Sequence, residues 1–238
     1  MFKTRFLAAA LALVAFNSQA ATLVEVKSSQ GQSKVWREGS LSRMDTGDGG
    51  YMVVDSKAET MLVVMPKERR VMDMSDLLKS SGSAGGNGIN VTFSKQGGGP
   101  DIAGYATTHY SYSANGKACG SVLASPQAMK DSGLQDALDM MQRMATRADA
   151  LMSAFNSQTD PCQRAGAQLS EHAGKIGAPM RITAPGGQLV SEIVRIDKNA
   201  SLPAGAFAIP EGYQVFNTGQ MLRQLPNLQD MMQQMQGR

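Results

Sequence analysis

The first part of the chain alternates short apolar or β-branched segments with turn-forming residues. The segments are Leu23–Lys27, Lys34–Arg37, Leu41–Asp45, Tyr51–Asp55, Thr60–Met65 and Arg70–Met74. The turn formers between them lie at residues 29–31, 48–50, 55–57 and 66–67. Strands at such short, regular spacing are typical of an antiparallel sheet that curls toward a barrel. This part of the chain is therefore predicted to be a β-meander.

The strand pattern resumes in the second half of the chain. The remaining predicted strands are Tyr105–Ser113, Lys117–Ala124, Met180–Thr183 and Gln188–Asp197. Asn115 and Gly116 separate the first two, and this pair favours a tight hairpin turn because both residues tolerate a positive φ. The glycine-rich stretches at residues 80–88 and 97–100 are predicted to be loops or hairpin tips. Neither ends in the Gly-Lys-Ser/Thr sequence of a phosphate-binding loop.

A helical pattern interrupts the strands. The apolar residues at helical spacing are Leu134, Leu138, Met141, Ala145, Ala148, Met152 and Phe155. They predict an amphipathic helix of about 24 residues with one face to bury. A second helix is predicted to begin at Asp160 and Pro161, which suit the N-cap and first helical positions. Gly174 or Gly177 is expected to end it. The helical insert thus spans about residues 126–177.

The first twenty residues have the order of a secretory signal peptide. Lys3 and Arg5 precede the apolar run Phe6–Phe16, and Ser18-Gln19-Ala20 offers a cleavage site. The run is shorter than the roughly 20 residues that span a bilayer, and no longer apolar run follows. We therefore expect export to a bacterial periplasm as a soluble protein without a membrane span.

The net charge argues against a nucleic-acid partner. The predicted signal peptide holds two of the 23 basic residues and none of the 20 acidic ones, which leaves 21 − 20 = +1. No basic stripe of the kind that binds nucleic acid is present in the sequence.

The two cysteines most simply form one disulfide, because the chain is predicted to be exported. Cys119 falls on a predicted strand and Cys162 in the first turn of a predicted helix. Free or intermolecular thiols stay open as an alternative. A redox role is a further alternative, since a helix N-terminus lowers a thiol pKa. Redox pairs are usually spaced Cys-x-x-Cys, and this chain has no such motif.

The sequence offers no recognisable catalytic or metal-binding motif. His109 and His172 are the two histidines, and neither has partners at metal-ligand spacing. No Gly-x-Ser-x-Gly nucleophile motif occurs, although a Ser-His-Asp set is recognised only in a fold. No catalytic residue, metal or cofactor is therefore assigned, and a hydrolase or redox enzyme is the least favoured class.

Methionine is unusually frequent, with 17 residues. Methionines fill irregular cores or make adaptable apolar binding surfaces. A third interpretation is a copper(I) site, because thioethers are soft ligands. Met231, Met232 and Met235 cluster most tightly and lie in a weakly amphipathic, Met-rich tail at residues 217–238.

Several motifs in a fixed order resemble an uncharacterised family of exported bacterial proteins related to the lipoprotein carriers LolA and LppX. The motifs are Trp36-Arg37-Glu38-Gly39, Arg43-Met44-Asp45, Tyr51-Met52-Val53-Val54-Asp55, Met61-Leu62-Val63-Val64-Met65-Pro66, Ile102-Ala103-Gly104-Tyr105 and Phe207-x-Ile209-Pro210-x-Gly212-Tyr213. The similarity covers about residues 22–125 and 178–216. It implies an unclosed β-barrel around helices, with an apolar cavity that holds acyl chains in the carriers.

Together these observations predict an α+β, mainly β fold. We expect residues 21–216 to form a single domain, an unclosed antiparallel β-barrel wrapped around the amphipathic helical insert. The expected function is non-catalytic binding of an apolar ligand, a lipid or acyl chain, between sheet and helix. The candidate lining residues are Met44, Met52, Met61, Leu138, Met141 and Met152. The same residues could instead fill a dry core, since burial stabilises either way.

The alternative function is an envelope interaction module, such as a sensor or chaperone-like partner of a lipoprotein or another envelope protein. It would use the same half-barrel or the Met-rich tail at residues 217–238.

Overall fold

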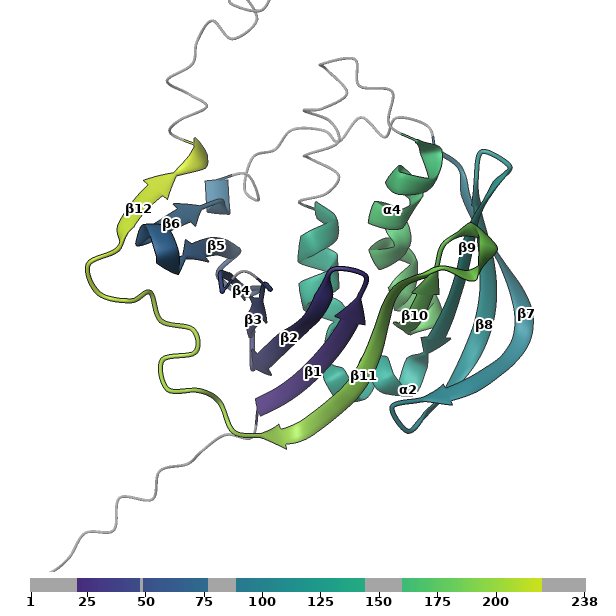
Figure 1. The fold of residues 1–238 in the computed structure, drawn as a ribbon, viewed down its shortest axis with the longest axis horizontal. Helices are drawn as coiled ribbons and strands as arrows, with labels where there is room; N and C mark the ends of the chain where they lie inside the picture. The colour runs from purple at the N-terminus through teal and green to yellow at the C-terminus, as the bar shows by residue number, and fades with distance from the viewer. Residues whose placement is uncertain (1–20, 48, 77–88, 144–159, 220–238) are drawn as a thin grey trace, which may run out of the picture.

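The computed structural model describes residues 21–47, 49–76, 89–143 and 160–219. They form one twelve-stranded sheet with helices against its inner face (Figure 1). In chain order the strands are β1 (Ala21–Ser28), β2 (Gly31–Glu38), β3 (Leu41–Asp45), β4 (Tyr51–Asp55), β5 (Thr60–Met65), β6 (Arg70–Asp73), β7 (Val91–Ile102), β8 (Tyr105–Ala114), β9 (Lys117–Ser125), β10 (Ala178–Thr183), β11 (Leu189–Ala200) and β12 (Gln214–Asn217).

The sheet is mainly antiparallel and is not closed. Across it the strands follow the order β12-β6-β5-β4-β3-β2-β1-β11-β10-β9-β8-β7. Every neighbouring pair is antiparallel except β12 and β6, which are parallel. Strand β11 pairs with β1 and so joins the N-terminal meander to the strands β7–β10. The mainly β prediction with an unclosed antiparallel sheet is confirmed at this level.

The meander prediction is confirmed closely. β3, β4 and β5 have the predicted bounds, and the other predicted strands differ only at their ends. The hairpin turn at Asn115 and Gly116 has positive φ at both residues, 50° and 80°. Strand β12 was not predicted, because four residues in a parallel pair at a sheet edge leave little sequence pattern.

The predicted loop at residues 97–100 is wrong, because these residues lie inside the long edge strand β7. Gly97 has φ +136° at a shift in register against β8. A Cβ at Gly99 would lie 2.5 Å from the Thr107 hydroxyl oxygen. Pro100 has no backbone N–H to donate to a neighbouring strand, and it is tolerated because β7 is an edge strand. Glycine here serves close packing within a strand. The stretch at residues 80–88 lies outside the described residues.

Three helical segments contribute to the inner side of the described sheet. They are α2 (Pro126–Ser132), residues 135–143, and α4 (Pro161–Ile176). Helix α4 begins as predicted: the Asp160 carboxylate accepts a hydrogen bond from the backbone N–H of Cys162. Of the two glycines predicted to end this helix, Gly177 is the C-cap residue. Helix α2 was not predicted as a separate element.

A polar cluster fixes α2 to the sheet. Tyr105 of β8 and Lys198 of β11 both donate to the Asp131 carboxylate, and so does Gln127 within α2. Desolvation opposes ionisation of Asp131, but these three hydrogen bonds together outweigh it and hold its pKa below the ordinary 3.8. The cluster therefore favours the ionised carboxylate in the folded state.

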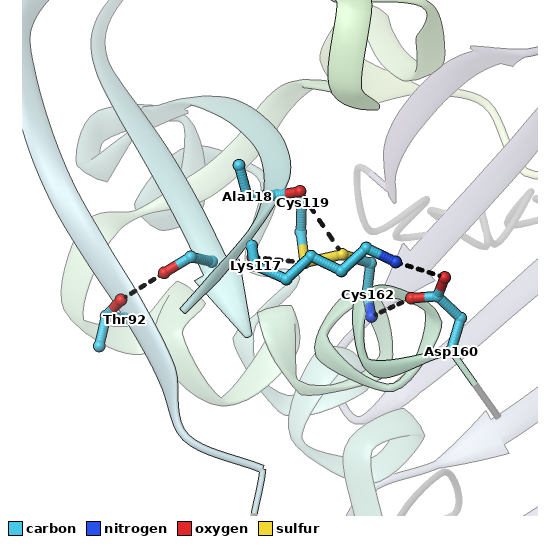
Figure 2. The surroundings of a disulfide bond; sticks show 7 residues. Thr92, Lys117, Ala118, Cys119, Asp160 and Cys162 are labelled. Carbon is cyan, nitrogen blue, oxygen red and sulfur yellow. Dashed lines mark hydrogen bonds and ion pairs between the residues drawn. A yellow bond between two sulfur atoms is a disulfide. The ribbon is translucent and has the colours of Figure 1, made fainter. Parts of the chain in front are cut away.

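The disulfide joins helix α4 to strand β9 (Figure 2). Cys119 and Cys162 are bonded across a sequence separation of 43 residues. Beside it, Lys117 Nζ lies 2.7 Å from Asp160 Oδ2. The hydrogen bonds that Asp160 accepts from Lys117 and from the backbone N–H of Cys162 both lower the pKa of its carboxyl group. The disulfide prediction is confirmed, and it ties the helical insert to the sheet.

The segment between β11 and β12 crosses the outer face of the meander. Phe207 and Tyr213 pack against a cluster formed by Tyr51, Val53, Val64 and Val71. The Tyr51 hydroxyl donates to the Ala208 carbonyl. Burial raises the pKa of Tyr51 above its ordinary value. This contact covers the face of β4–β6 that lies opposite the helices.

Arg43 links that crossing segment to β3. Its guanidinium bonds Asp45 at 2.6 Å, donates to the Ala206 carbonyl at 3.0 Å, and lies 3.7 Å from the Tyr51 ring centre. The Trp36 indole N–H also donates to Asp45. The motif that begins at Tyr51 and the last motif of the resemblance thus meet on the outer face.

The Asp131 cluster makes stability depend on pH. Because the folded pKa lies below the unfolded one, the stabilisation is present above the unfolded value and is lost as pH falls through the folded value. We expect Asp131→Asn to lower the free energy of unfolding at about pH 7, with the difference from wild type shrinking toward about pH 2.5. Urea denaturation at both pH values measures this. A difference independent of pH would contradict it.

Removing the disulfide is expected to destabilise the fold. For a separation of 43 residues, the loss in unfolding free energy is at most about 4 kcal/mol for Cys119→Ala with Cys162→Ala. Reduction of wild type should reproduce the effect in urea denaturation. Equal stability of oxidised and reduced protein would show that the bond does not constrain the unfolded chain.

Arg43→Met should lower the free energy of unfolding by about 2 kcal/mol, because it removes two charge-assisted hydrogen bonds and a cation–π contact. Arg195→Met is the matched control: Arg195 also pairs with a carboxylate two residues on, Asp197, but its side chain is 55% exposed against 20% for Arg43. The control should change stability by less than about 0.5 kcal/mol. Equal losses of unfolding free energy in the two variants would contradict the stabilising role of the Arg43 contacts.

Candidate functional site

An apolar cavity lies between the inner face of the sheet and the helical residues that follow α2. Its volume is about 280 Å³. Its walls are formed by Val24, Val26, Val35, Ser42, Met44, Met52, Val54, Leu134, Ala137, Leu138, Met141, Pro179, Ser191 and Ile193. Both the meander and the strands β10 and β11 contribute. The cavity therefore exists only where the two parts of the sheet meet.

Alternation along the strands builds the sheet wall. Side chains two residues apart on a strand share a face, so Val24 and Val26 of β1 both point inward. Pairing then places inward residues side by side: Val35 is opposite Met44, and Met44 is opposite Met52. The two methionines thus form adjacent parts of the wall.

The helical wall follows from spacing along one helix face. Leu134, Leu138 and Met141 are four and three residues apart, which places them on one side of a helix. Ala137 lies between them on the same side and leaves room for the cavity. Gly133 permits the turn from α2 because its φ is +61°.

The wall offers apolar contact and little else. Apart from the hydroxyls of Ser42 and Ser191, its side chains are aliphatic or thioether groups. No titratable side chain is among these lining residues, so the wall itself supplies no acid, base or charged nucleophile. Ligand pockets usually measure about 300–1,000 Å³. The cavity is therefore at the small end and suits a slender apolar group.

Four of the six predicted lining residues meet at this cavity: Met44, Met52, Leu138 and Met141. Met61 lies instead in an adjacent core cluster with Val54 and Met140. Met152 lies outside the described residues, as do Met231, Met232 and Met235. That any of them contacts a ligand stays a prediction.

Sequence reasoning missed much of the wall. Val24, Val26 and Val35 have inward positions that strand alternation alone could have indicated. Ile193 could not have been found in that way, because it reaches the cavity through the pairing of β11 with β1. Met140, which is fully buried at 0% exposure, was also not singled out, and it belongs to the adjacent core cluster with Met61.

The potential metal ligands among the described residues are dispersed. Among the described residues, no three His, Cys, Asp or Glu side chains gather as a potential metal-ligand set. His172 packs its ring 4.5 Å from the centre of Phe93. No helix within the described ranges is long and apolar enough to cross a membrane.

Comparison with known proteins gives a family but no activity. None of the curated proteins matches the chain significantly. A family model described as a domain of unknown function, DUF4412, matches residues 38–213. The match includes the disulfide, the helical wall of the cavity and the segment that crosses the outer face. Because it covers well over half of the 238 residues, the chain belongs to the DUF4412 family.

Proposed function

We propose that this protein is an exported, non-catalytic binding protein that holds one apolar ligand, of the lipid or acyl-chain class, in its cavity. The apolar cavity between the sheet and residues 134–141 carries the proposal. Its wall offers dispersion contacts and excludes water, which suits a hydrocarbon chain. Its small volume favours a single chain over a bulky, multiply acylated lipid.

Two further observations support the proposal. Three motifs of the resemblance to a family related to the LolA and LppX carriers lie on β2, β3 and β4, which contribute to the cavity wall. The disulfide fits an oxidising compartment such as the periplasm, where the signal-like first twenty residues would direct the chain. Those residues lie outside the described part, so export stays a proposal.

Native mass spectrometry of residues 21–238, purified from a periplasm, tests the proposal directly. We expect a mass excess under native conditions that denaturation releases as an apolar molecule. The measurement also names the cargo class. A bare mass for every preparation, together with no uptake of added apolar probe, would overturn the proposal.

Filling the cavity should prevent binding without unfolding the protein. Ala137→Phe places a ring in the cavity, and we expect at least about tenfold weaker binding of the uncharged fluorescent probe N-phenyl-1-naphthylamine. Ala106→Phe is the control, because Ala106 is exposed on β8, away from the cavity wall. Thermal unfolding checks that both variants fold. Equal probe affinity in the two variants would place binding elsewhere.

The second candidate function is the envelope interaction or sensor module. Its support is the edge strand β12, where Val215 is 55% and Phe216 38% exposed. An extended segment of a partner protein could add to this edge. Loss of co-purifying envelope proteins in Val215→Asp with Phe216→Asp, while probe binding in the cavity is retained, would favour this function over ligand carriage.

A further inference from the structure

The cationic side chain of Arg37 lies beside the wall of the apolar cavity. Arg37 follows Val35 by two residues on β2, so both side chains are on the inner face of the sheet. Arg37 is also the register partner of Ser42, whose side chain lines the cavity. The arginine is therefore adjacent to the wall on the sheet side.

The guanidinium also contacts the helical side of the cavity. A Cβ at Gly133 would lie 1.8 Å from Arg37 Nη1, so the arginine occupies the space above that glycine. The next residue, Leu134, lines the cavity. The Arg37 side chain is 24% exposed, which leaves part of it open to solvent. The guanidinium thus lies against the turn at Gly133, on a strand whose partner residue Ser42 lines the cavity, and part of the side chain is open to solvent.

Arg37 has spare hydrogen-bonding capacity. Its Nη2 donates to Asp136 Oδ2 at 3.2 Å, and Asp136 is its hydrogen-bond partner among the described residues. A guanidinium carries five N–H donors. The Asp136 side chain is 57% exposed, and ion pairs at such positions contribute little to stability. A second carboxylate could therefore share or replace Asp136 at small cost.

We propose that the ligand is a single-chain amphiphile with an anionic head, and that Arg37 binds that head while the cavity encloses the chain. This inference rests on the proposed function and adds its ligand class. A carboxylate, as in a fatty acid, matches the planar guanidinium through two parallel hydrogen bonds. The head lies at the solvent-facing rim, and the chain contacts Met44, Met52 and Leu138.

The experiment compares ligands that differ only in the head group. Residues 21–238 are titrated with dodecanoate, methyl dodecanoate and dodecyl phosphate in competition with N-phenyl-1-naphthylamine. We expect dodecanoate to bind about tenfold more tightly than its uncharged ester, because of the charge-assisted hydrogen bonds. The phosphate arm identifies the source of the head: tighter binding of dodecyl phosphate names a phosphate lipid, and tighter binding of dodecanoate names a fatty acid.

Two variants test the role of Arg37. Arg37→Met keeps an unbranched stem beside Gly133, and we expect it to abolish the preference for the acid while ester affinity is unchanged. Asp136→Asn removes the competing charge and should raise acid affinity severalfold. Arg195→Met, an exposed arginine on β11, is the control and should retain the preference. If Arg37→Met fails to fold, the affinity of Asp136→Asn for dodecanoate decides whether Arg37 binds the head.

The outcomes separate the two proposals. Equal binding of acid and ester by wild type would overturn the anionic-head inference and leave apolar binding intact. An acid preference that persists in Arg37→Met, or an acid affinity that does not rise in Asp136→Asn, would overturn the role of Arg37. No binding of any of the three compounds or of the probe would overturn the proposed function itself.

Discussion

The pairing of β1 with β11 is the interaction on which the rest of the structure depends. It joins the N-terminal meander to the strands β7–β11 and makes one continuous sheet. Val26 lies opposite Ile193 in this pairing, and both residues line the cavity. Without it the two sets of strands would bury separate faces, and no wall would enclose the space beside residues 134–141.

The remaining long-range contacts hold that sheet against its helices. The disulfide fixes α4 to β9, and the Asp131 cluster fixes α2 to β8 and β11. On the opposite face, Arg43 and Tyr51 hold the segment that leads to β12. These contacts lie outside the cavity, so the wall itself can stay apolar and incompletely filled. The apolar wall and the neighbouring Arg37 are the two features on which the proposed amphiphilic ligand rests.

Local patterns predicted the elements well because periodicity and turn residues act over a few positions. The strands from Leu41 to Met65 and the start of α4 at Asp160 were located in this way. The glycines of β7 misled the same reasoning, since their small size serves packing against Thr107 within a strand. Met44 and Leu138 could be proposed as wall residues because each lies on an apolar face. Met61, on an equally apolar face, packs with Met140 instead.

The sequence by itself determined the mainly β class, the faces that strands and helices bury, and the two cysteines available for a disulfide. Only the tertiary structure decided which faces meet: the partner of β1, the parallel addition of β12, the cavity, and the position of Arg37 over Gly133. The physical reason is the distance along the chain over which each feature is set. Side-chain periodicity is set by neighbouring backbone geometry, whereas strand order and cavity volume depend on contacts between residues far apart in the chain.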